Sequence, residues 1–240
     1  MRRGAAFMAA MLTAVLCNPS AVMAAGLRPF EAHYELRHSG ITVATNTVTL
    51  TGSDKSVWLY RSVTEAAGLM SLVRSDMRIE SSRLRRQGDR LVPIEYHYER
   101  HGGRSDRNVV ISFDWPNHRA LNTVEGQTWE LPVPPHTQDK FGMQLSLMLD
   151  KQRGVQPLVY PIADGGTLKE YRFEFIEKVS VDTGIGELEA HHLRRKRDND
   201  ERVTDIWLAP ELGYLPVRID QAKKGEGSAT MRLERFRYTD

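Results

Sequence analysis

Four histidines are placed so that they could bind a metal ion. His97 and His101 are four residues apart in a segment with strand-like alternation, so both side chains would lie on the same face. His191 and His192 lie in a second segment of this kind. With a carboxylate such as Glu99 they could form a zinc site, because zinc binds imidazole and carboxylate ligands. The alternative is four solvent-facing histidines on strand exteriors, and we predict no metal ligands.

Other catalytic patterns are missing from the sequence. It has no Gly-x-Ser-x-Gly nucleophile motif, and its glycine turns do not have phosphate-loop spacing. Ser146 lies among apolar neighbours in a helical segment. Carboxylate pairs such as Glu31 and Glu35 arise by chance on any charged strand face. We therefore predict no catalytic residues, no cofactor and a protein that is not an enzyme, with a metal-assisted hydrolase on the histidines as the last alternative.

Two groups of apolar side chains could line a cavity for an apolar ligand. One group lies in the segment 65–73, which lacks clean alternation, and the other lies on one face of a predicted helix. The six candidates are Leu69, Met70, Leu72, Phe141, Leu145 and Met148. Methionine adapts to flexible chains, and ligand pockets are mostly apolar. The alternative is that these residues only form the core.

The elements that would position these residues are mainly strands. Alternation of apolar and polar residues begins at 30–36, with Phe30, Ala32 and Tyr34 on one face, and it recurs throughout the chain to 231–238. Short turns that contain glycine separate the segments, as at 38–40, 87–89 and 164–166. Such turns are too short for crossover helices, so the sheet should be antiparallel and largely up-and-down.

Two segments interrupt this pattern of strands. The spacing of Phe141, Leu145 and Met148 predicts an amphipathic helix over 136–154, with Thr137 as its N-cap and Gly154 after its end. Segment 65–73 is predicted to be a short helical or irregular crossing. The fold class is therefore mainly β: a single curved antiparallel sheet, a half-barrel or barrel, with one amphipathic helix on its concave face.

The first residues have the pattern of a secretory signal peptide. Arg2 and Arg3 precede an apolar run, and small residues end it, which predicts a signal at 1–25 with cleavage after Ala24 or Ala25. Residues 26–240 would then be a single domain without a transmembrane anchor, located in the periplasm. The only cysteine, Cys17, would leave with the signal, so the mature chain would have no disulfide.

The net charge of the mature chain argues against a nucleic-acid partner. Removing Arg2 and Arg3 lowers the Lys and Arg count from 33 to 31, which equals the 31 Asp and Glu. A neutral chain with interspersed charges lacks the basic field that nucleic-acid binders use, so we expect no nucleic-acid partner.

The order of these features resembles the domain-of-unknown-function 3108 family, an uncharacterised family of exported proteobacterial proteins. The resemblance rests on the opening strand 30–36, on Gln138-Asp139 with the helix that contains Leu145, and on 205–208 followed by 213–219. More loosely, the chain is similar to half-barrel periplasmic carriers of lipoproteins or lipids, in which a curved sheet encloses an apolar cavity. This resemblance implies a fold, whereas function has to be argued from a site.

The sequence thus predicts an exported binder of a hydrophobic or amphiphilic envelope ligand, such as a lipid or acyl chain. The alternative is an envelope interaction or scaffold protein that presents sheet edges, or the stretch 132–135, to another envelope protein. The identity of the ligand, the closure of the barrel and the oligomeric state do not follow from the sequence.

Overall fold

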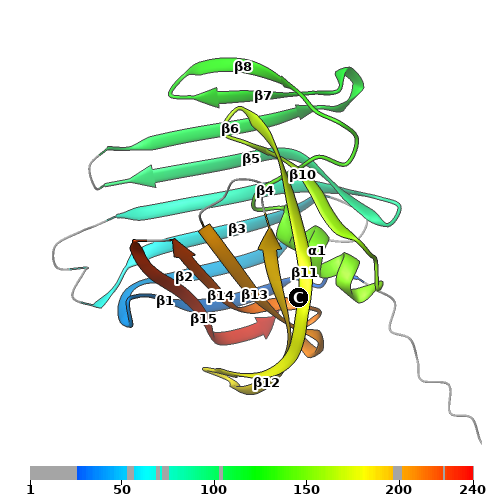
Figure 1. The fold of residues 1–240 in the computed structure, drawn as a ribbon. Coiled ribbons are helices and arrows are strands. Elements are labelled where there is room, and N and C mark those ends of the chain that lie inside the picture. Colours follow the sequence, from blue (N-terminus) through cyan, green and yellow to red (C-terminus); the bar gives the residue numbers. More distant parts are fainter. Residues whose placement is uncertain are drawn as a thin grey trace, which may run out of the picture.

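The protein is described here by a computed structural model that covers residues 26–52, 57–68, 71, 76–102, 105–196, 202–223 and 225–239. These residues form one sheet of 15 strands together with one α-helix (Figure 1). The predicted signal peptide, residues 1–25, lies outside the described residues. None of the described helices is long and apolar enough to cross a membrane.

The helix is α1 (Met143–Gln152), and two short 3-10 helices are η2 (Trp115–Asn117) and η3 (Pro210–Leu212). The strands are β1 (Phe30–His38), β2 (Ile41–Thr51), β3 (Val57–Ala66), β4 (Met77–Gln87), β5 (Arg90–His101), β6 (Arg107–Asp114), β7 (Arg119–Val124), β8 (Gln127–Pro132), β9 (Gln138–Asp139), β10 (Leu158–Asp164), β11 (Thr167–Thr183), β12 (Gly186–Lys196), β13 (Arg202–Ala209), β14 (Leu215–Lys223) and β15 (Glu226–Tyr238).

Two up-and-down halves make up the sheet. Strands β1 to β8 follow one another on one side, β15 to β9 follow in reverse order on the other, and β1 pairs with β15 between them. All pairs are antiparallel except the short β9 with β10. The sheet is open, since its order runs from β8 to β9. The mainly antiparallel, up-and-down prediction is confirmed, and of the two predicted forms the half-barrel is the one observed.

Alternation along the strands produces the curved sheet's buried inner face. In β1 the side chains of Phe30, Ala32 and Tyr34 are buried, while those of Glu31 and His33 are only partly covered. Period-two alternation puts the first set on the concave face and the second on the convex face. The sheet curls around α1, which lies on its concave side (Figure 1).

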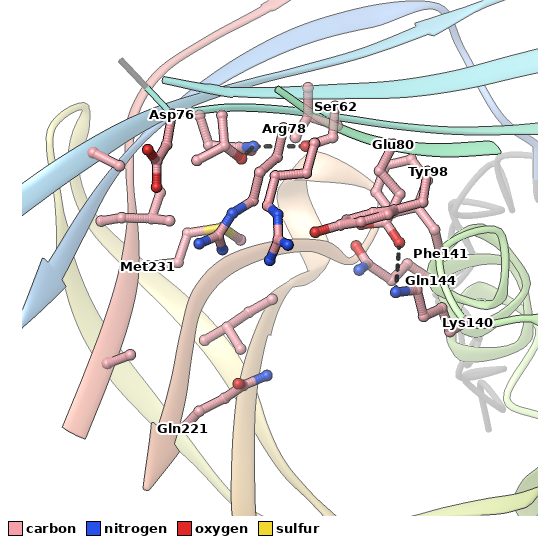
Figure 2. A pocket seen from close by; sticks show the side chains of 18 of the residues that line it. Ser62, Asp76, Arg78, Glu80, Tyr98, Lys140, Phe141, Gln144, Gln221 and Met231 are labelled. Atoms are coloured by element: carbon pink, nitrogen blue, oxygen red, sulfur yellow. Dashed lines mark hydrogen bonds and ion pairs between the residues drawn. The ribbon is translucent and has the colours of Figure 1, made fainter. Parts of the chain in front are cut away.

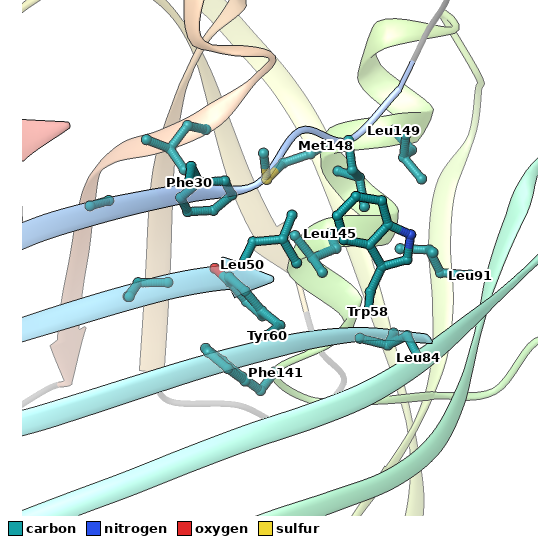
Figure 3. Close-up of a cluster of buried hydrophobic side chains, with 14 of the residues drawn as sticks. Phe30, Leu50, Trp58, Tyr60, Leu84, Leu91, Phe141, Leu145, Met148 and Leu149 are labelled. Carbon is teal, nitrogen blue, oxygen red and sulfur yellow. The ribbon is translucent and has the colours of Figure 1, made fainter. Parts of the chain in front are cut away.

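Helix α1 is buried on two sides because it lies between the two halves of the sheet. Leu145, Met148 and Leu149 belong to one apolar cluster with Trp58 and Leu84 of the first half (Figure 3). On its other side, the helix contributes Met143 and Leu147 to a second apolar cluster. The second half of the sheet contributes residues that include Leu158, Ile162, Leu193 and Leu208. The helix therefore joins both halves into one core.

The predicted start of the helix was wrong. Thr137 is buried and its hydroxyl donates to the carbonyl of Pro134, while Gln138 and Asp139 form β9. The helix begins only at Met143, after the Asp139 carboxylate has accepted the N–H groups of Phe141 and Gly142. The prediction placed the N-cap at the first residue with a suitable side chain, whereas the two residues that follow Thr137 pair with β10 as a strand.

The segment 65–73 differs only in part from the predicted short helical or irregular crossing. Glu65 and Ala66 are the last residues of β3, paired with β2. Gly68 and Ser71 have 3-10 geometry, and the other residues from 69 to 73 lie outside the described residues. The hairpin of β7 and β8 was not singled out from the sequence, although Glu125 and Gly126 supply the two positive φ angles of its turn.

Candidate ligand-binding cavity

A cavity of about 1130 Å³ lies on the concave side of the sheet. It is bounded by the inner faces of β1 to β6, by β14 and β15, by the residues just before α1 and in its first turn, and by the turn between β10 and β11. Figure 2 shows side chains from these elements extending into the same space. Its volume is slightly above the usual range for small-molecule sites.

The two walls of the cavity differ in character. The wall on β1, β2, β14 and β15 is mostly apolar, with Leu36, Val48, Ile219 and Met231 among its residues. The facing wall on β4 to β6 is mostly polar or charged, and it includes Arg78, Glu80, Tyr96, Tyr98, Arg100 and Arg107. A cavity of this kind suits an amphiphile, because each part of such a molecule meets a matching surface.

The floor of the cavity is formed by Lys140, Phe141 and Gln144. The Phe141 ring stacks on the Tyr60 ring with centroids 4.2 Å apart, and the Tyr60 hydroxyl donates to Gln144 Oε1 at 3.1 Å. The floor is thus fixed to β3 by one apolar and one polar contact. Phe141 belongs both to the core and to the cavity surface.

Glu80 organises the charges next to the floor. The Tyr96 hydroxyl donates to Glu80 Oε1 at 2.6 Å, and Lys140 Nζ lies 3.3 Å from the same oxygen (Figure 2). Burial, together with the Glu80 carboxylate, raises the pKa of Tyr96. Burial by itself would lower the pKa of Lys140, but the attraction of Glu80 and Asp164 outweighs it and raises that pKa. Lys140 therefore stays charged at neutral pH.

Asp139 lies beneath this floor and is fully buried. Its Oδ1 accepts the Ser82 hydroxyl at 2.5 Å and the N–H groups of Phe141 and Gly142 at 2.9 and 2.7 Å. Burial raises the pKa of this carboxyl to about 6, although the three hydrogen bonds oppose the shift. Asp139 is not among the lining residues, so its role is to hold the turn before α1.

The six residues predicted to line a cavity have different positions. Phe141 lines it, whereas Leu145 and Met148 are buried in the core next to it and are not part of the lining. Leu69, Met70 and Leu72 lie outside the described residues.

The histidines considered for metal binding each have other neighbours, and the ring of His191 lies edge-on to the rings of Phe175 and Tyr214. His97 lies 2.8 Å from Glu95 and His101 lies 3.2 Å from Glu99, in each case two residues along β5. His192 Nε2 lies 2.9 Å from Asp205 Oδ1 on β13. In the part of the chain that the structure describes, no three His, Cys, Asp or Glu side chains come together as a metal site requires.

The charged wall was not predicted from the sequence. Arg100 follows Tyr96 and Tyr98 at a spacing of two, which indicates an inward position for an arginine. This signal was available. The alignment of Arg100 with Arg78 and Arg107 depends on strand register, which a single sequence does not reveal.

Comparisons with known proteins concern family and fold. A structure from Brucella abortus, a beta-barrel-like protein of the domain of unknown function DUF1849, is similar with a TM-score of 0.61. It shares 12% identity, and the match covers 90% of this chain and 100% of that one, so the likeness concerns the fold alone. A Bacteroides fragilis protein of YmcC-like fold has 10% identity, covering 88% of this chain and 96% of that one, with a TM-score of only 0.35.

The curated proteins contain no match to this chain. The model of one protein family, described as "Protein of unknown function (DUF3108)", matches residues 29–234. The match extends from the residue before β1 to within β15, so it includes every residue that lines the cavity. The chain therefore belongs to the DUF3108 family of proteins of unknown function.

Proposed function

We propose that this protein is exported and, without catalysing a reaction, binds an amphiphilic envelope molecule such as a lipid or acyl-chain compound in the concave cavity. The observation that carries the proposal is the cavity of about 1130 Å³ with one apolar wall and one charged wall. Export rests on the signal-peptide pattern of residues 1–25.

The direct experiment has two steps. Native mass spectrometry of protein released gently from the periplasm tests for a bound lipid or acyl species. Delipidated protein is then titrated with a fluorescent acyl-chain probe. We expect a co-purifying lipid mass and saturable binding. If neither is found, the proposal is wrong.

A pair of neighbouring variants locates the binding site. Ala44 lines the cavity, and the next residue, Thr45, is exposed on the opposite face of β2. Ala44→Phe should fill part of the cavity and weaken binding of the probe, whereas Thr45→Phe should leave it unchanged. If both variants bind like the wild type, the probe binds elsewhere.

A scaffold function is the second candidate, and one observation favours it. Among the described strands, β8 ends the sheet and pairs with β7 alone, and its side chains from Gln127 to Glu130 are exposed. An edge of this kind can accept a strand from a partner. Isolation of a stable complex that is lost when Thr128 is changed to Pro would support this function. The histidines provide no comparable support for a hydrolase.

A further inference from the structure

Three arginines lie next to one another on the charged wall of the cavity. Strand register places Arg78 of β4 opposite Arg100 of β5, and Arg100 opposite Arg107 of β6. All three line the cavity. We propose that this arginine row binds the anionic headgroup, a carboxylate or a phosphate, of the amphiphile held in the cavity. The inference rests on the proposed function of that cavity.

The positive charge of the arginine row is not neutralised within the described residues. The guanidinium groups of Arg78 and Arg107 have no ion pair or hydrogen bond there. Arg100 donates to the carbonyl and the hydroxyl of Ser105, at 3.1 and 3.0 Å, and both acceptors are uncharged. Like charges directly opposite each other on neighbouring strands destabilise a sheet. An anion bound between the arginines would relieve this repulsion.

The acidic residues of the lining are engaged elsewhere. Glu80 accepts from Tyr96 and lies against Lys140, and Asp164 pairs with Lys169. The third acidic residue of the lining, Asp76, is not without a partner either. The lining as described contains five Lys or Arg residues and three Asp or Glu residues, so its net charge is positive. This excess favours an anionic ligand over a cationic one.

The chemistry and position of the row indicate which part of the ligand it binds. Guanidinium groups form paired hydrogen bonds with carboxylate and phosphate oxygens. Figure 2 shows Arg78 and Met231 extending into the same space from different walls. A headgroup at the arginine row would therefore leave the chain of the ligand facing the apolar wall, where Leu36 and Ile219 also lie.

The test compares ligands that share a chain and differ in charge. Delipidated protein is titrated calorimetrically with dodecyl phosphate, dodecanoate, neutral monododecanoylglycerol and inorganic phosphate. We expect both anionic amphiphiles to bind at least about tenfold more tightly than the neutral one. The Arg78→Gln/Arg107→Gln variant should lose about tenfold or more in affinity for the anions, with no change for the neutral ligand.

Arg85→Gln is the matched control, because Arg85 is exposed on β4 and does not line the cavity. It should bind all the ligands as the wild type does, and thermal melts verify that every variant is folded. Equal affinity for charged and neutral amphiphiles would overturn the headgroup proposal and leave the cavity function standing. If no amphiphile binds, both fail. If inorganic phosphate binds as tightly as dodecyl phosphate, the row is a site for free anions.

Discussion

The hydroxyl of Ser82 donates a 2.5 Å hydrogen bond to the buried carboxylate of Asp139. Ser82 lies on β4 in the first half of the sheet, and Asp139 lies on β9 at the end of the second half. The same carboxylate accepts the N–H groups of Phe141 and Gly142. One side chain thus holds together the strand, the turn before α1 and the cavity floor.

The stability of the protein should depend on the protonation of Asp139. Burial raises the pKa of its carboxyl to about 6 in the folded state, so between about pH 4 and 6 the folded chain binds a proton that the unfolded chain has released. The contribution to the free energy of unfolding is complete below about pH 4 and is lost as the pH rises through about 6. Its size is roughly 3 kcal/mol.

Asp139→Asn isolates this contribution, because asparagine keeps the Oδ1 acceptor but does not titrate. Urea unfolding of both proteins between pH 4 and 7 should show a decrease in wild-type stability that is smaller in the variant by about that amount. Parallel pH profiles would show that Asp139 does not titrate in this range.

Phe141→Ala should destabilise the protein by about 3–5 kcal/mol, since it removes a buried ring that stacks on Tyr60. Equilibrium unfolding in urea measures the loss. Phe175→Ala serves as the control, because the Phe175 ring is 48% exposed and its removal should cost much less. Similar losses in the two variants would contradict the packing described at the floor of the cavity.

Gly166→Ala should destabilise the turn between β10 and β11 more than Gly165→Ala does. Both glycines have positive φ, so alanine at either position would strain the backbone and lower the free energy of unfolding. A Cβ at Gly166 would lie 2.1 Å from Trp129 Nε1, whereas a Cβ at Gly165 meets nothing within 4 Å. The difference between their unfolding free energies therefore measures the contact of this turn with β8. It should disappear in a Trp129→Ala background.

Arg78→Gln should leave the ligand-free protein as stable as the wild type or raise its unfolding free energy by up to about 1 kcal/mol. The reason is that the substitution removes one of the like charges that face each other across β4 and β5. Thermal melts of delipidated protein measure the effect. A clear loss of stability would show that Arg78 has a structural role, which would weaken the case for a binding site.

Much of the fold could be predicted because its signal is local. Alternation in 30–36 predicted the inner face of β1, and the glycine turn at 87–89 predicted the hairpin of β4 and β5. The start of α1 was misplaced because Thr137 has the right chemistry for an N-cap but is tied to the carbonyl of Pro134. That contact depends on the path of the chain between β8 and β9.

The candidate site was less predictable, because its walls are formed by residues that are distant in sequence. Met231 and Arg78 meet at one cavity only because both halves of the sheet curve around the same space. An apolar side chain such as Phe141 could be selected from its helical spacing. The sequence did not distinguish Phe141, which lines the cavity, from Leu145, which packs beside it.

The pairing of β1 with β15 has a consequence for how the chain folds. Each half of the sheet is a series of neighbouring hairpins, which can form from local contacts, but among the described residues the two halves pair as strands only where the first and last strands of the chain meet. Contacts of such large sequence separation slow folding. Deletion of β15 would divide the sheet between β1 and β14 and would remove the part of the cavity wall that contains Met231.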